Sequence, residues 1–218
     1  MLKLIDFKDK HKDQDIYVFG SGPTCNFIDP SFFDNKICVG TNQTYRKFKS
    51  EYIVRKDHKL LQETLDSNES IVLASRLNYG SGAEIEIEKY NNTDNLCIYD
   101  HLINTETINL KEFDNINKLV VSYSTITTSI HFAYYLGAKN IILVGVDHGI
   151  LDGKITFDKY YNDIKETEWE NWQLYKNWLK KINKDTIELK QKINQLGVNV
   201  YSLNPFINFQ LEGHKYEF

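Results

Sequence analysis

The chain has little arginine, and this shortage excludes one class of protein. Only three of its 26 basic residues are arginine, and the formal net charge at pH 7 is −4. Proteins that bind nucleic acids usually present a basic face rich in arginine side chains. We therefore expect no nucleic-acid partner.

Long apolar runs and paired cysteines are also lacking. The longest clean apolar run, 141–146, is far shorter than the roughly 20 residues of a transmembrane helix, and the first 15 residues contain no apolar core of signal-peptide length. The three cysteines, Cys25, Cys38 and Cys97, are odd in number and have no CxxC spacing, which is typical of small buried side chains in a reducing compartment. We expect a cytoplasmic protein without a transmembrane segment.

What the sequence does contain is an alternation of short apolar runs with longer helical patterns. Runs of β-branched residues, as in 141–146, are typical of parallel strands covered on both faces. The pattern predicts a single-domain Rossmann-like α/β fold over residues 1–218, with a mostly parallel sheet and helices on both faces. The expected strands are 16–20, 36–40, 52–55, 71–75, 96–100, 119–122, 140–146 and 199–202.

Helical spacing of apolar residues predicts a helix over 125–137, another that opens at the capping-box pattern 167–170, and a third from about Asp185 to Gly197. The second of these helices carries tryptophans. Their side chains fit either core packing or a subunit contact in a homo-oligomer, and the sequence does not separate the two.

Small, polar and ionisable residues follow the ends of the expected strands. They stand at 20–24, 41–44, 56–58, 123–125 and 147–149. Ligands of open parallel sheets bind beyond the carboxyl ends of the strands, so this clustering predicts a binding site at that edge. The segment 148–166 follows the most apolar strand and is polar and irregular, and we expect it to form a lid over the site.

The residues Gly20-Ser21-Gly22-Pro23-Thr24 end the first expected strand. Two glycines would let backbone N–H groups approach an anion, and a helix opening at the proline would favour phosphate at its N-terminus. The stretch matches neither G-x-G-x-x-G nor a P-loop. Two interpretations stay open: a phosphate cradle, or a tight strand-to-helix turn without a ligand.

Two other stretches could carry chemistry. Residues 122–129 hold six serine and threonine hydroxyls where a helix should begin, either to cap that helix or to bind a phosphate or sugar. Asp147-His148 follows the most apolar strand. The histidine could act as a general base toward a hydroxyl acceptor, and the aspartate could orient it, bind a ribose hydroxyl, hold a metal or simply cap the next turn.

The stretches "VFGSGPTCNFID", "VGTNQTY" and "TITTSIHFAYYLGAKNIILVGVDHG" resemble the bacterial lipooligosaccharide sialyltransferases. They also resemble a broad set of proteins grouped with hydroxymethylpterin diphosphokinase-like enzymes, often encoded with surface-polysaccharide genes. The resemblance runs from residue 16 to about 158 and resumes in "GVNVYSLNPFINF". It implies a cytoplasmic transferase of lipopolysaccharide biosynthesis that takes a nucleotide-sugar donor, which in the sialyltransferases is activated by CMP, and a glycan acceptor.

The resemblance also implies a donor site. In the sialyltransferases the matching glycine-rich turn and the asparagine matching Asn42 lie against the CMP donor, and the residues matching Ser124 and Thr125 lie beside it at a helix start. Those enzymes need no metal ion, so none is expected here. The predicted donor-binding residues are Gly20, Ser21, Gly22, Pro23, Thr24, Asn42, Ser124 and Thr125.

The chain departs from the sialyltransferases in its lid. Those enzymes use a histidine base there, whereas this chain has no histidine between His148 and His214. The two tyrosines that hold the departing phosphate correspond to Gly149 and Ile155, and an arginine expected just before the hydroxyl-rich stretch is replaced near Ser122. The predicted catalytic residues are therefore His148, Asp147, Tyr160 and Tyr161.

Three functions are compatible with these patterns. The first is a glycosyltransferase of surface-glycan synthesis that needs no cofactor. The second is a Mg²⁺-dependent pyrophosphokinase acting on a pterin-like alcohol, with Asp57 and Asp147 as the carboxylates for the ion. The third is a nucleotide-sugar-binding protein without catalysis. The donor's base and sugar and the acceptor are not identified by the sequence.

Overall fold

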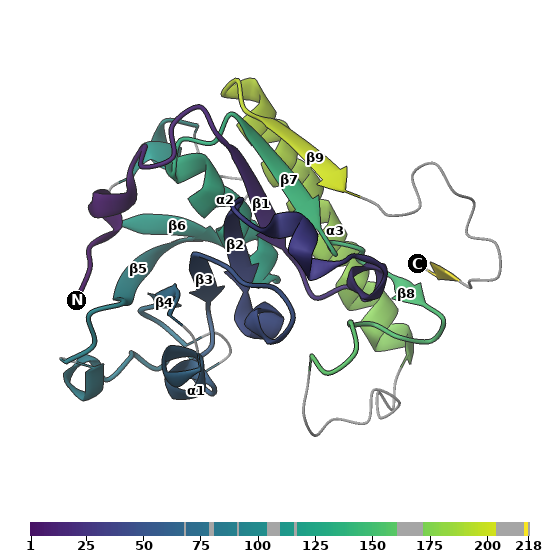
Figure 1. The fold of residues 1–218 in the computed structure, drawn as a ribbon, viewed down its shortest axis with the longest axis horizontal. Coiled ribbons are helices and arrows are strands. Elements are labelled where there is room, and N and C mark those ends of the chain that lie inside the picture. The colour runs from purple at the N-terminus through teal and green to yellow at the C-terminus, as the bar shows by residue number, and fades with distance from the viewer. Residues whose placement is uncertain are drawn as a thin grey trace.

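A computed structural model of the chain describes residues 1–67, 69–78, 81–90, 92–103, 110–115, 117–160, 172–203 and 216–217. Its centre is an eight-stranded sheet (Figure 1) with the order β6-β5-β4-β3-β2-β1-β7-β9, in which all neighbouring strands are parallel. The strands are β1 (Asp15–Phe19), β2 (Ile37–Thr41), β3 (Tyr52–Arg55), β4 (Ile71–Ser75), β5 (Leu96–Ile103), β6 (Lys118–Val121), β7 (Asn140–Val144) and β9 (Asn199–Leu203). The predicted α/β fold with a mostly parallel sheet is confirmed.

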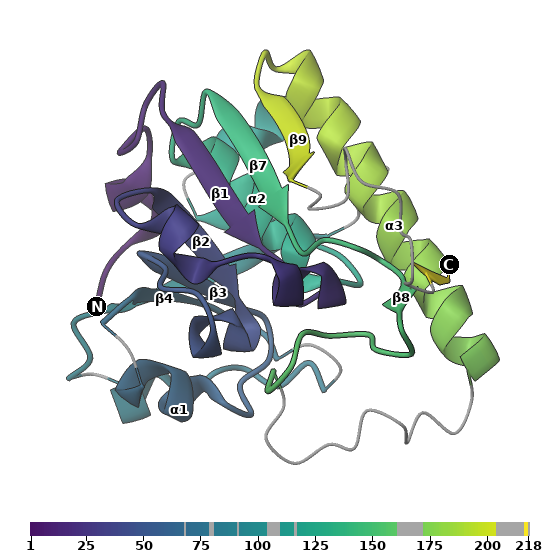
Figure 2. The ribbon, with the colours of Figure 1, turned by 45° about the vertical axis from the view of Figure 1, so that its right-hand side comes forward.

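Helices cover both faces of this sheet. Their bounds are η1 (Leu4–Phe7), η2 (Pro23–Phe27), η3 (Pro30–Phe33), η4 (Asn42–Arg46), α1 (Leu61–Asp66), η5 (Ile87–Tyr90), η6 (Leu110–Asp114), α2 (Thr125–Tyr135) and α3 (Trp172–Gln195), where η marks a 3-10 helix. In Figure 2, α2 and α3 lie behind the sheet and the short helices that follow β1 and β2 lie in front. A small antiparallel pair, β8 (Ile150–Leu151) with β10 (Tyr216–Glu217), stands apart from the main sheet.

The alternation of side chains along β1 explains the two layers of core. Ile16 and Val18 point to the face covered by α2, where they join the largest apolar cluster. Phe19 points to the other face and packs against Phe33 and Phe48. Because both faces are apolar, the strand can be buried only in the interior of a sheet covered on both sides.

The strand order reverses at β1, and this sets where a ligand can bind. The chain adds β2 to β6 on one side of β1, and then α2 returns it to β7 on the other side. Connections on the two sides of β1 therefore leave in opposite directions, which opens a crevice at the carboxyl ends of these strands.

The prediction of two separate helices in the region 167–197 is wrong. One helix, α3, runs through Asp185, because no proline or glycine interrupts the sequence from Trp172 to Gln195. Its buried side chains Leu179, Ile182 and Leu189 follow helical spacing along a single face. The capping-box pattern 167–170 lies outside the described residues.

No helix in the described part of the chain has the length and apolar character needed to cross a membrane.

A buried histidine ties α2 to two neighbouring segments. His131 is fully buried; its Nδ1 accepts the Val120 N–H at 2.9 Å, and its Nε2 lies 2.9 Å from the Phe113 carbonyl oxygen. The backbone donor therefore requires an unprotonated Nδ1, with the proton on Nε2. Burial lowers the pKa of His131 to about 4.

We expect this histidine to make the protein sensitive to acid. An unfolded histidine has a pKa of about 6.5, so the contribution of His131 to stability is complete above that pH and is lost as the pH falls toward 4. The gap corresponds to about 3 kcal/mol in the free energy of unfolding. Urea unfolding between pH 7.5 and 4.5 should show a shallower pH dependence in His131→Asn than in the parent. Identical pH dependence in the two proteins would contradict this.

Candidate functional site

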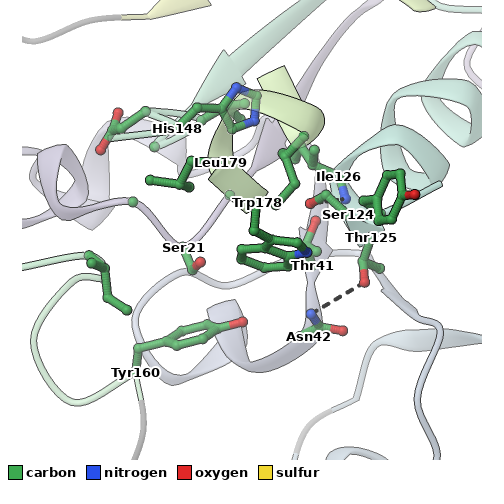
Figure 3. A pocket seen from close by; sticks show the side chains of 18 of the residues that line it. Ser21, Thr41, Asn42, Ser124, Thr125, Ile126, His148, Tyr160, Trp178 and Leu179 are labelled. Atoms are coloured by element: carbon green, nitrogen blue, oxygen red, sulfur yellow. Dashed lines mark hydrogen bonds between the residues drawn. The ribbon is translucent and has the colours of Figure 1, made fainter. Parts of the chain in front are cut away.

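A pocket of about 240 Å³ lies at the carboxyl ends of β1, β2, β3 and β7, next to the start of α2 (Figure 3). The structure brings together on its walls the predicted residues Gly20, Ser21, Gly22, Asn42, Ser124, Thr125, Asp147, His148 and Tyr160. Pro23 and Thr24 are buried behind the wall and are not part of the lining. Tyr161 lies outside the described residues.

The glycine turn, residues 20–24, is hydrogen-bonded through its backbone N–H groups to the end of β7 and to the residues that follow it. The Gly20 N–H donates to the Val144 carbonyl at 2.8 Å, and the Gly22 N–H donates to the Gly145 carbonyl at 2.7 Å. The Thr24 N–H donates to Asp147 Oδ2 at 2.8 Å. These three amides are therefore not available to a phosphate, which is what the phosphate-cradle interpretation of this stretch requires.

Close packing, rather than an anion, accounts for the glycines. A Cβ atom on Gly22 would overlap the Asp147 carboxylate, and one on Gly145 would overlap the Cys25 sulfur. Gly145 also has a left-handed backbone with φ of 63°. The helix that opens at Pro23 is a 3-10 helix of five residues, too short for a large dipole. This stretch is thus a tight strand-to-helix turn that forms one wall of the pocket.

Asp147 holds this turn in place. Its carboxylate accepts the Thr24 hydroxyl at 2.6 Å as well as the Thr24 N–H. Burial raises the pKa of Asp147, and the two bonds from Thr24 act in the opposite direction. Asp147 therefore caps the turn that follows β1, far away along the chain, which is a different turn from the one that follows Asp147 itself.

Asn42 combines a left-handed backbone with a buried hydrogen-bond acceptor that has no partner among the described residues. It has a left-handed backbone with φ of 53°, and its Nδ2 is 3.5 Å from Thr125 Oγ1 (Figure 3). Its Oδ1 is buried and has no hydrogen-bond partner among the described residues. A buried carbonyl without a donor costs about 1–3 kcal/mol. Strain and an unmet acceptor together are typical of a residue shaped by what it binds.

Most of the hydroxyls in 122–129 serve the fold. Thr128 donates to the Val120 carbonyl at 2.7 Å, Thr127 donates to the Ser124 carbonyl at 2.8 Å, and Ser129 Oγ lies 2.9 Å from Thr41 Oγ1. Thr127, Thr128 and Ser129 are fully buried. Ser124 caps α2 by accepting the Ile126 N–H at 3.3 Å, and only Ser124 and Thr125 of the six line the pocket.

His148 and Tyr160 belong to other parts of the wall. The His148 ring lies against α3, with Nδ1 3.3 Å from Asn183 Oδ1 and Nε2 3.5 Å from Thr186 Oγ1. Burial lowers the pKa of His148, so the imidazole is mainly neutral at neutral pH. In Figure 3, His148 and Tyr160 approach the pocket from separate segments, with Trp178 drawn between them.

The described part of the expected lid, up to residue 160, is fastened to the glycine turn. The Phe157 N–H donates to the Ser21 carbonyl at 2.9 Å, and the Asp158 N–H donates to Asn26 Oδ1 at 2.9 Å. Tyr160 is held through its carbonyl oxygen, which accepts from Arg46 Nη1 at 2.8 Å. Residues 161–166 lie outside the description. The described portion covers one side of the pocket.

Two lining residues were not singled out from the sequence. Lys56 follows β3, is only 6% exposed, and donates from Nζ to the Ser122 carbonyl at 2.6 Å. Trp178 is 41% exposed and extends from α3 to the pocket, so of the two alternatives left open by the sequence, core packing does not hold for it. The position of Lys56 at a strand end was visible in the sequence, but its burial was not.

The two aspartates considered for a metal ion have protein partners. Asp147 binds Thr24, and Asp57 forms an ion pair with Arg55 Nη2 at 3.1 Å. Within the described residues, no group of three or more His, Cys, Asp or Glu side chains is placed to hold a metal ion.

No protein-family model matches the sequence, and no curated protein matches it. Two solved structures are of the sialyltransferase CstII from Campylobacter jejuni. The complex with the substrate analogue CMP-3FNeuAc is 17% identical, with a TM-score of 0.52 over 90% of this chain and 84% of that one. The complex with cytidine-5'-monophosphate is 17% identical, with a TM-score of 0.51 over 89% and 81%.

A third match is the MAf glycosyltransferase from Magnetospirillum magneticum AMB-1, which is 12% identical with a TM-score of 0.44. The alignment covers 68% of this chain but only 27% of that one, so the chain spans about a quarter of that protein's length. At these identities the CstII structures show the fold alone. The chain shares the fold of the CstII structures.

The Asp147–Thr24 contact can be tested by a double-mutant cycle. We expect Thr24→Val to lower the free energy of unfolding by about 1 kcal/mol and Asp147→Asn by about 1–3 kcal/mol, because each removes bonds at a buried carboxylate. The double variant should lose at least about 0.5 kcal/mol less than the sum, because both changes remove the same hydroxyl–carboxylate bond. Urea unfolding measures all four proteins, and strict additivity would refute the coupling.

Proposed function

We propose that the chain is a glycosyltransferase of surface-glycan synthesis that takes a sugar donor activated by CMP. The observation that carries the proposal is the unmet acceptor of Asn42 in a pocket at the strand switch point, beside the first turn of α2. The fold shared with the CstII structures supports it, as do the CMP and CMP-3FNeuAc complexes of CstII at the level of that fold. The proposed partners are the nucleotide-sugar and a glycan acceptor.

The donor would bind between Asn42 and α2. A ribose hydroxyl or the amino group of the base would donate to Asn42 Oδ1 and supply its missing partner. Ser124 and Thr125 stand at the N-terminus of α2, a helix of 11 residues whose dipole favours an anion there. The glycine turn, with Ser21, would provide a close-fitting wall rather than amide donors.

In the reaction, the acceptor hydroxyl oxygen attacks the anomeric carbon of the donor sugar. The bond from that carbon to the phosphate oxygen breaks, CMP leaves, and a base takes the hydroxyl proton. His148 is the proposed base, because its imidazole is mainly neutral at neutral pH and can accept a proton. The segment up to Tyr160, bound over the glycine turn, would keep water from hydrolysing the donor. The proposal includes no metal cofactor, and transfer in the presence of EDTA tests that part.

Nucleotide binding is the first test. Calorimetric titration should show that CMP binds, and that UDP and GDP bind more weakly. We expect Asn42→Gly to weaken CMP about tenfold, because it keeps the left-handed backbone but deletes the acceptor. The same change should alter the free energy of unfolding by less than about 1 kcal/mol, because it also removes an unsatisfied group. No binding of any of the three nucleotides at millimolar concentration would sink the proposal.

The base is tested separately from binding. We expect His148→Gln to leave the CMP affinity within a factor of about two but to slow CMP release from a CMP-activated sugar by about 10²-fold or more. Tyr160→Phe is the matched variant on the other wall. A slow Tyr160→Phe beside an unaffected His148→Gln would transfer the role to Tyr160. If the parent protein binds CMP but never cleaves the CMP-activated sugar, the result would instead favour a nucleotide-sugar-binding protein without catalysis.

A further inference from the structure

Lys56 is a buried cation on the wall of the pocket. Lysine is rarely this buried without a function or a charged partner, and only 6% of the residue is exposed. Its ammonium donates to the carbonyl of Ser122, two residues before the N-cap of α2, so the charge lies beside the first turn of that helix. Of the residues described along the pocket, it is the one lysine or arginine.

Several charged and titratable groups surround Lys56. Asp57 follows it in the chain, but the Asp57 carboxylate is paired with Arg55. Asp185 on α3 approaches from the other side and accepts the Tyr123 N–H at 3.4 Å. His101 on β5 lies close enough for Lys56 to lower its pKa further, after burial. Two further titratable groups, Asp147 and His148, line the same pocket.

Burial has a larger effect on the pKa of Lys56 than the neighbouring charges do. It lowers the pKa of Lys56 to about 7, with Asp57 and Asp185 acting in the opposite direction. A lysine in this state is only partly charged at neutral pH. An anion placed in the pocket would favour the charged form and draw a proton onto the amine.

We propose that Lys56 binds the phosphate of the nucleotide donor beside the first turn of α2, and that donor binding is coupled to uptake of a proton by this side chain. The inference rests on the proposed function and adds to it the residue that recognises the charge. A purely structural lysine that caps the Ser122 carbonyl would bind no phosphate and would show no linkage between nucleotide and proton.

The coupling fixes the sign of the pH dependence. Affinity for an anion is highest where Lys56 is charged and falls as the pH rises through its pKa in the free protein, about 7. A phosphate monoester has its own second pKa near 6, so the range from pH 7 to 9 isolates the lysine. We expect the Kd of CMP to rise about tenfold across that range.

The experiment is calorimetry of CMP at pH 7.5 in two buffers of different ionisation enthalpy, which counts protons taken up on binding. The parent should take up about 0.7 proton. Lys56→Met should bind CMP about tenfold more weakly at pH 7 and lose both the proton uptake and the rise of Kd above pH 7. The matched control is Lys59→Met, which removes an exposed lysine three residues away and should behave as the parent.

The outcomes separate the two proposals. Two results would overturn the role of Lys56 but not the donor site. One is CMP binding by the parent with no proton uptake and with a constant Kd from pH 7 to 9. The other is a folded Lys56→Met variant that binds CMP as tightly as the parent does. Absence of CMP binding in the parent would overturn both. The proton count and the pH profile of the parent need no variant, so they decide the question even if Lys56→Met fails to fold.

Discussion

The pocket depends on one buried contact, the Asp147 carboxylate bound to the hydroxyl and amide of Thr24. Asp147 follows β7 and Thr24 follows β1, the two neighbouring parallel strands at which the strand order reverses. Bonding their ends together fixes how wide the crevice can be at the switch point. Gly22 is needed because a Cβ atom there would overlap the Asp147 carboxylate, and Gly145 is needed because a Cβ atom there would overlap the Cys25 sulfur. The position of the wall formed by the glycine turn is therefore fixed by the protein's own contacts.

A second set of contacts places the opposite wall. The pair Thr41–Ser129 joins the end of β2 to α2, and Thr128 joins α2 to β6. These buried hydroxyls leave little freedom in the position of the first turn of α2. As a result Thr125 reaches Asn42, and the residue with the unmet acceptor lies directly beside the end of the helix that favours an anion. The relative positions of Asn42 and the first turn of α2 are therefore set by the buried hydrogen bonds of Thr41, Thr128 and Ser129.

The sequence predicts the strands well because their signal is local. Each strand is an apolar run bounded by polar residues, and parallel topology then gathers the strand ends, which is why Asn42 and Ser124 could be placed together. The contact of Gly22 with Asp147 could not be predicted, because Asp147 lies far away along the chain. A pair of glycines also gives the same sequence pattern whether the turn faces a phosphate or a carboxylate. The burial of Lys56 also depends on tertiary packing. The ammonium that donates to the Ser122 carbonyl belongs to Lys56, which follows β3 and is distant along the chain.

The distribution of charge favours a donor with one phosphate. All three arginines are committed to acidic partners, in the pairs Arg46–Glu63, Arg55–Asp57 and Arg76–Asp100. Among the described lining residues Lys56 is the one lysine or arginine, and the lining also carries two aspartates. A triphosphate or diphosphate brings several negative charges, and a partly protonated lysine with one helix end would leave most of them uncompensated. A CMP-activated sugar has a single phosphodiester charge at its reacting end, which one lysine and one helix N-terminus can balance.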